Sequence, residues 1–179
     1  MQPKRIVILG NAGSGKSSLA RRLGEKLALP VVHLDRLFWR PGWTKPAASE
    51  FRVSVAEALK GSRWISEGNY HRRTFDLRLP NADLIIWLDT PRLVCMKRVV
   101  LRSLRNKPRP DLPEGCAEKI DAEFAAFLRY VWRFDRDERP AIETARRAQG
   151  LNVPVIHLRG PAQVDKFVAA LASGHDPRE

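Results

Sequence analysis

Residues 5–17 read Arg5-Ile6-Val7-Ile8-Leu9-Gly10-Asn11-Ala12-Gly13-Ser14-Gly15-Lys16-Ser17. The first five residues form a short apolar run rich in β-branched side chains, which predicts a buried strand closed by Gly10. From Lys16 to Leu27 the leucines recur four residues apart, which predicts a helix. The stretch therefore predicts a strand, a glycine-rich loop and a helix in direct succession.

The loop matches the pattern Gly-x-x-x-x-Gly-Lys-Ser, which is the phosphate-binding P-loop. Its glycines let backbone N–H groups turn toward phosphate oxygens, and the helix N-terminus adds partial positive charge. Lys16 is expected to reach the β and γ phosphates of ATP or GTP, and Ser17 to ligate Mg²⁺. The alternative, a chance glycine-rich turn, does not explain the strand before it and the helix after it. The expected nucleotide site comprises Gly10, Asn11, Ala12, Gly13, Ser14, Gly15, Lys16, Ser17 and Ser18.

The rest of the chain alternates between strand-like and helix-like segments. Short apolar runs at 31–34, 64–66, 84–88 and 154–158 predict further strands, and 47–59, 91–102, 117–148 and 162–172 have helical composition, with a division expected near Arg139-Pro140. Strands without polar alternation predict a parallel sheet that is covered on both faces. We expect one α/β domain spanning 1–179.

The composition of the chain limits the classes of partner and the location that we expect. The formal net charge of +12 favours anionic partners, a class that includes nucleotides, nucleic acids and membrane surfaces. No apolar run is long enough to cross a bilayer and no cleavable signal precedes the first strand, so the expected location is the cytoplasm. Cys95 and Cys116 show no metal-ligand spacing and are expected to be buried or idle thiols without an assigned role.

Acidic residues follow three of the predicted strands, where ligands collect in an open parallel sheet. Asp35 could orient or deprotonate a substrate hydroxyl, or it could cap a helix. Glu67 could hold Mg²⁺ through water, with even weight on a purely structural role. Asp89 precedes Thr90-Pro91, and capping the next helix is the favoured role.

Aromatic residues lie beside Asp35. Phe38, Trp39 and Trp43 could form a wall that binds a base or ring, or they could belong to the core.

A basic segment follows the fourth strand. Arg98, Arg102 and Arg105 are spaced to share one helix face, and Arg109 lies in a proline-rich stretch. We expect a lid at approximately 104–118 that brings these arginines over the phosphates as catalytic groups. A solvated basic face, or one that contacts a nucleic-acid backbone, is the alternative.

Several segments together resemble a known family, the adenylate kinase-related P-loop proteins often labelled DNA topology modulation proteins. The resemblance covers almost the whole chain and rests on the P-loop, HLDRLFW (33–39), PGW (41–43), EGNY (67–70), LDTPR (88–92), RPD (109–111) and GC (115–116). It implies a nucleoside monophosphate kinase-like fold with a five-stranded parallel sheet in the order 2-3-1-4-5 and a lid after the fourth strand. By the same resemblance, Arg159 and Pro161 would border the adenine. Asp35-Arg36 resembles kinases of small hydroxylated substrates instead of kinases of AMP.

Three functions remain open at this stage. The leading one is a kinase that moves the γ-phosphoryl group of ATP-Mg²⁺ to a hydroxyl or phosphate of a small acceptor. The alternatives are a nucleotide-regulated nucleic-acid-binding protein and a slow NTPase switch. The chain carries no helix-turn-helix, zinc-finger or RNA-recognition signature, which favours the enzyme.

Overall fold

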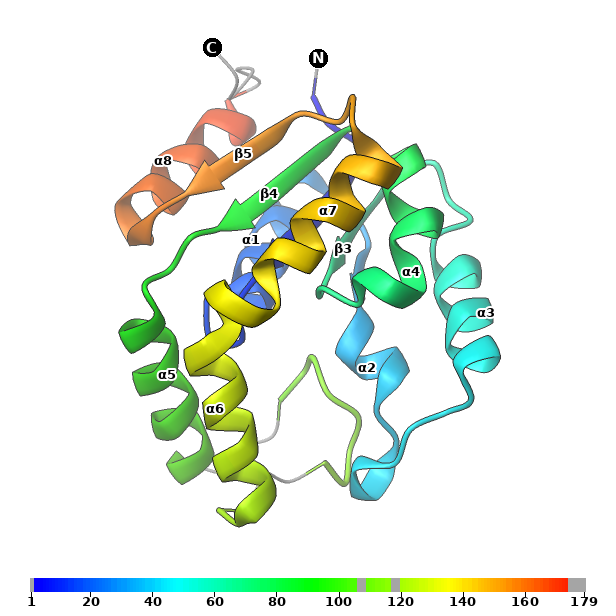
Figure 1. Cartoon of the computed structure of the whole chain (residues 1–179). Helices are drawn as coiled ribbons and strands as arrows, with labels where there is room; N and C mark the ends of the chain where they lie inside the picture. Colours follow the sequence, from blue (N-terminus) through cyan, green and yellow to red (C-terminus); the bar gives the residue numbers. More distant parts are fainter. Residues whose placement is uncertain (1, 106–108, 117–119, 174–179) are drawn as a thin grey trace.

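A computed structural model describes residues 2–105, 109–116 and 120–173. Its centre is a parallel sheet of five strands in the order β2-β3-β1-β4-β5 (Figure 1). The strands are β1 (Arg5–Gly10), β2 (Val31–His33), β3 (Trp64–Glu67), β4 (Leu84–Leu88) and β5 (Val155–Leu158). The sheet and its strand order confirm the fold expected from the sequence.

Helices connect the strands. The α-helices are α1 (Lys16–Leu27), α2 (Leu34–Phe38), α3 (Ala48–Ala58), α4 (His71–Arg78), α5 (Arg92–Arg105), α6 (Ala122–Asp137), α7 (Arg139–Gly150) and α8 (Gly160–Ala172). Two short 3₁₀ turns are η1 (Pro41–Trp43) and η2 (Leu79–Asn81). Within the described ranges, no helix is both long and apolar enough to cross a membrane.

Both faces of the sheet are buried, as the continuous apolar strands predict. Alternate residues of β1 point to opposite sides: Ile6 and Ile8 pack with α1 and α8, while Val7 and Leu9 pack with α4, α6 and α7. A smaller cluster around Phe51 joins α2 to α3, and Val99 of α5 packs on α6. The layers thereby fix the carboxyl ends of β1, β3 and β4 beside one another.

Several boundaries differ from the sequence-based prediction. The second strand ends at His33 because Leu34 already begins α2. The fourth helix, α4, was not predicted. The long helical region divides at Glu138, close to the expected site, into α6 and α7. Of the expected lid, 104–105 belong to α5 and 109–116 cross toward α2 (Figure 1), while 106–108 and 117–118 lie outside the described residues.

Candidate functional site

The P-loop between β1 and α1 has a backbone that requires glycine at its turns. Gly13 and Gly15 have φ values of 77° and 104°, in the left-handed region that side chains disfavour. A Cβ atom at Gly13 would lie 2.5 Å from the carbonyl oxygen of Cys95 on α5. The loop therefore needs glycine both for its conformation and for its close contact with α5.

Polar side chains lie close to the backbone of the P-loop. Lys16 Nζ donates to the Asn11 carbonyl at 2.9 Å, and the buried Ser14 hydroxyl has no hydrogen-bond partner among the described residues. Arg98 reaches in from α5 and donates to the Ser14 carbonyl at 3.1 Å. A lysine ammonium and an unpaired buried hydroxyl are groups that phosphate oxygens would satisfy, so these residues fit a nucleotide.

A cleft of about 1740 Å³ opens in front of this loop. Ala12 to Ser18 line one wall, whereas Gly10 and Asn11 lie behind it, and the Asn11 side chain donates to the Val131 carbonyl of α6 at 2.8 Å. The expected aromatic residues also line the cleft, and they pack edge-on against one another. These residues are Phe38, Trp39 and Trp43.

Asp35 lies in the same cleft, on the first turn of α2. Tyr70 donates its hydroxyl to Asp35 Oδ1 at 2.6 Å. Burial raises the pKa of Asp35, and the negative charge of Glu67 adds to this increase. The Tyr70 hydrogen bond and the positive charges of Lys16 and Arg109 act in the opposite direction without reversing it. Asp35 is thus a carboxylate with increased proton affinity that lies within electrostatic reach of the P-loop lysine.

The other two strand-end acids have partners of their own. Glu67 is 2% exposed, and its Oε1 atom is hydrogen-bonded with His33 Nδ1 at 2.7 Å. Asp89 pairs with His157 and Arg139, each at 2.8 Å, so its described contacts join β4, β5 and α7. The favoured role of Asp89 as a helix cap is therefore not what these contacts show, because its oxygens face the Arg139 guanidinium and the His157 ring across the sheet edge.

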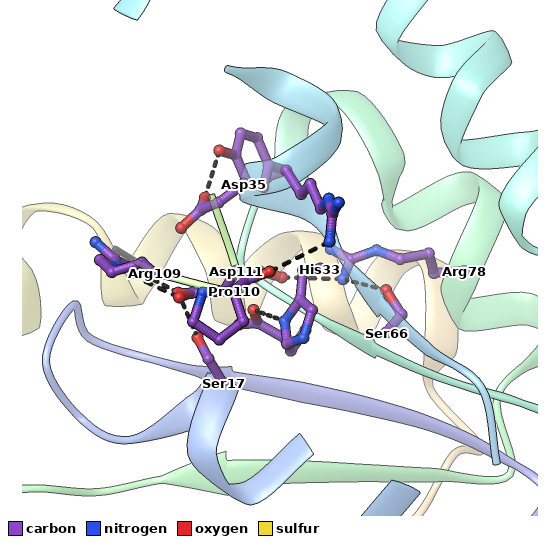
Figure 2. A network of polar contacts seen from close by, with 12 residues as sticks. Ser17, His33, Asp35, Ser66, Arg78, Arg109, Pro110 and Asp111 are labelled. Atoms are coloured by element: carbon purple, nitrogen blue, oxygen red, sulfur yellow. Dashed lines mark hydrogen bonds and ion pairs between the residues drawn. The ribbon is translucent and has the colours of Figure 1, made fainter. Parts of the chain in front are cut away.

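The loop after β3 joins the part of the cleft that holds Asp35 to the P-loop. Asn69 forms a two-way hydrogen bond with the Gly10 backbone, at 3.2 Å to its N–H and 3.0 Å to its carbonyl. Behind the loop, the fully buried guanidinium of Arg78 donates to the carbonyls of Gly68 at 2.9 Å and Asn69 at 2.5 Å. It also donates to the Ser66 hydroxyl at 3.3 Å (Figure 2). This loop carries Tyr70, so Arg78 indirectly positions the partner of Asp35.

The predicted arginines separate into two groups. Arg98, Arg102 and Arg109 line the cleft, whereas Arg105 is exposed and lies outside its lining. The helix turns Arg105 away because α5 packs on α6 with Val99 and Cys95 inward. On the far side, Pro161 lines the cleft, while Arg159 is 78% exposed and approaches Asp89 instead. Both cysteines are free and buried, as expected.

Three residues of the site were not assigned roles from the sequence: Tyr70, Arg78 and Asp111. Tyr70 and Asp111 belong to the segments EGNY and RPD, on which the family resemblance rests. The sequence therefore singled out both positions but did not indicate what their side chains do. Asp111 accepts a hydrogen bond from Ser17, the expected magnesium ligand, at 3.0 Å. Hydroxyl and carboxylate oxygens are the donors that Mg²⁺ prefers, so the residues present fit this ion.

Comparison with known proteins identifies the family. No protein-family model matches the chain. A shikimate kinase from Corynebacterium glutamicum is 30% identical over 119 residues, which cover 60% of this chain and 68% of that protein. The chain belongs to the shikimate kinase family. A second shikimate kinase, from Bradyrhizobium diazoefficiens, is 29% identical over 135 residues, covering 67% of this chain and 65% of that protein.

A solved structure agrees with membership of the shikimate kinase family at the level of the fold. Shikimate kinase from Bacteroides thetaiotaomicron matches with a TM-score of 0.58 and 18% identity, covering 96% of this chain and 97% of that one. The chain is a small-molecule P-loop kinase, which confirms the enzyme class expected from the sequence. These relatives do not support the label of DNA topology modulation.

Proposed function

We propose that the protein transfers the γ-phosphoryl group of ATP, bound with Mg²⁺, to a hydroxyl group of a small acceptor. The P-loop from Gly10 to Ser18 would hold the phosphates, and Lys16 would contact the transferred group. Pro161 would border the adenine, with Arg159 at the rim. Magnesium would neutralise charge between the β and γ phosphates. Kinase relatives and a cleft that joins the P-loop to an acid-bearing wall support the proposal.

The pair formed by Asp35 and Tyr70 is the observation that carries this proposal. The Asp35 carboxylate lines the same cleft as Lys16 and is within range of its charge, so an acceptor hydroxyl bound beside Asp35 would lie near the γ-phosphate. A carboxylate with a raised pKa is a better proton acceptor than an ordinary aspartate. Tyr70 engages one oxygen, so the other oxygen can orient the hydroxyl and take its proton as the new O–P bond forms.

Positive charge surrounds the expected path of the phosphoryl group. Lys16, Arg98, Arg102 and Arg109 all line the cleft and would stabilise the charge that develops on the transferred oxygens. We assign no catalytic part to Arg105, because it lies outside the lining. Glu67 is already paired with His33, so Ser17 is the stronger candidate of the two expected magnesium ligands.

The acceptor is best sought among hydroxylated acids. Arg73 of α4 lines the cleft with its guanidinium 5.4 Å from the centre of the Phe38 ring, beside the Asp35 wall. A cation there would favour an acceptor that carries negative charge. Since both relatives are shikimate kinases, shikimate is the first compound to test.

The test is acceptor-dependent ADP release, measured with shikimate, other hydroxylated acids, polyols, nucleosides and nucleoside monophosphates. We expect one class to stimulate release by the wild type, and Lys16→Ala to abolish the response. Asp35→Asn should lower kcat about 10²–10⁴-fold and leave the Kd for ATP unchanged. Glu50→Gln, which alters an exposed acid on α3, should match the wild type. Stimulation by no compound, or an unchanged kcat in Asp35→Asn, would contradict the proposal.

A further inference from the structure

The carboxylate that accepts a hydrogen bond from Ser17, the expected magnesium ligand, comes from a distant part of the chain. Ser17 Oγ donates to Asp111 Oδ2 at 3.0 Å, although the two residues are 94 positions apart (Figure 2). The acids at the strand ends are engaged elsewhere: Asp35 with Tyr70, Glu67 with His33, and Asp89 with His157 and Arg139. Among the described residues, Asp111 is the carboxylate that contacts Ser17.

Asp111 is buried and held by the side chain of Arg109. It is 6% exposed, and both of its oxygens accept hydrogen bonds from Arg109, Oδ1 at 3.2 Å and Oδ2 at 2.5 Å. These contacts fix a buried carboxyl group beside the Ser17 hydroxyl.

The segment that carries Asp111 is also fixed to α2 and η1. Gly42 of η1 donates its N–H to the Gly115 carbonyl at 3.1 Å, and the Cys116 thiol lies 3.2 Å from the Arg40 carbonyl. Arg36 of α2 approaches the Pro110 carbonyl at 3.5 Å. Residues 109–116 thus span from the P-loop to α2 and η1, and Asp111 is the point at which they contact the P-loop.

We propose that Asp111 is the carboxylate that supports the divalent cation at Ser17, in the place where Glu67 was expected to act. The inference rests on the proposed function, since the cation would arrive with ATP. Magnesium in phosphoryl-transfer sites is held by one or two carboxylates together with substrate phosphates. A carboxylate that accepts the serine proton also turns the oxygen lone pairs of that serine toward the ion. Metal binding at Ser17 and the placement of Arg109 over the cleft then depend on the same side chain.

Equilibrium binding of a non-hydrolysable ATP analogue tests this inference apart from catalysis. Its Kd is measured in EDTA and in Mg²⁺. The Kd in EDTA divided by the Kd in Mg²⁺ reports how much the metal contributes to binding. We expect Asp111→Asn to reduce the ratio about 10–100-fold relative to the wild type. Glu114→Gln removes an exposed carboxylate from the same segment and should keep the wild-type ratio. Electron paramagnetic resonance of Mn²⁺ added to the nucleotide complex should show the same order of affinities.

The outcomes separate the inference from the function on which it rests. An unchanged Kd ratio in Asp111→Asn would overturn the metal role, even if affinity falls by the same factor in EDTA and in Mg²⁺. If Asp111→Asn fails to fold, Asp111→Glu replaces it. A Kd ratio closer to that of the wild type than to that of Ser17→Ala supports the metal role of Asp111. A Kd ratio equal to that of Ser17→Ala overturns it. Wild-type protein that binds no nucleotide under either condition would refute the proposed function itself, and the inference with it.

Discussion

The Arg78→Met variant tests whether one buried guanidinium holds the loop that joins the two halves of the cleft. Arg78 is fully buried on α4 and donates to the Gly68 carbonyl, the Asn69 carbonyl and, at 3.3 Å, the Ser66 hydroxyl. Its guanidinium also lies 5.1 Å from the centre of the Phe75 ring. Methionine fills much of the same volume but donates no hydrogen bond.

The size of the effect follows from these contacts. A buried polar group left without a partner costs about 1–3 kcal/mol, so the two carbonyls together represent about 2–6 kcal/mol. Burial lowers the pKa of Arg78 to about 9, which shows that enclosing its charge opposes folding, and methionine removes this cost. Because methionine removes this cost, we expect the net loss in the free energy of unfolding to be smaller than that sum, about 1–4 kcal/mol. For a chain of this size, such a loss lowers Tm by roughly 2–16 °C.

Thermal unfolding followed by circular dichroism measures this loss, and acceptor kinetics measure its consequence. Because the loop carries Tyr70, the partner of Asp35, KM for the acceptor should rise while the Kd for ATP changes little. Arg52→Met is the control, since Arg52 also packs against α4 but forms a half-exposed ion pair with Asp76, worth about 1 kcal/mol or less. If Arg78→Met costs no more stability than this control, or leaves the KM of the acceptor unchanged, Arg78 does not hold the loop that carries Tyr70.

Further predictions concern charge and backbone in the cleft. Burial raises the pKa of Asp35 in the folded protein, so the folded state loses stability as pH rises from the ordinary aspartate value through that pKa. Asp35→Asn should accordingly melt above the wild type at pH 7.5 and lose this advantage at acid pH; an equal Tm across the range would contradict the assignment. Gly13→Ala should abolish ATP binding, measured by calorimetry, because its Cβ would meet a backbone oxygen at 2.5 Å. Arg105→Ala should leave kcat and KM within about twofold, and a tenfold loss would return this exposed residue to the site.

Much of the fold could be predicted because its sequence signals are local. The strand, loop and helix around the P-loop match the prediction, since glycine spacing and apolar periodicity act over a few residues. Helix α4 was not predicted because HRRTFDLR is dominated by polar residues. Its inward face consists of Thr74, Phe75 and Arg78, and a buried arginine cannot be distinguished from a surface one by pattern alone.

The candidate site was predictable only in part for a related reason. Asp35 and Glu67 could be selected because acids that follow parallel strands gather at one edge. Their partners could not, because Tyr70 reaches Asp35 across 35 positions and Asp111 reaches Ser17 across 94. Such contacts depend on how the chain crosses the cleft, which local periodicity does not encode.

Transfer of label from [γ-³²P]ATP shows whether the protein phosphorylates a small acceptor. The protein is incubated with Mg²⁺ and the acceptor that stimulates ADP release, and labelled acceptor is separated from labelled inorganic phosphate. We expect one labelled acceptor molecule for each ADP in the wild type and none in Lys16→Ala. Label recovered only as inorganic phosphate would contradict phosphoryl transfer to an acceptor and would leave a nucleotide hydrolase.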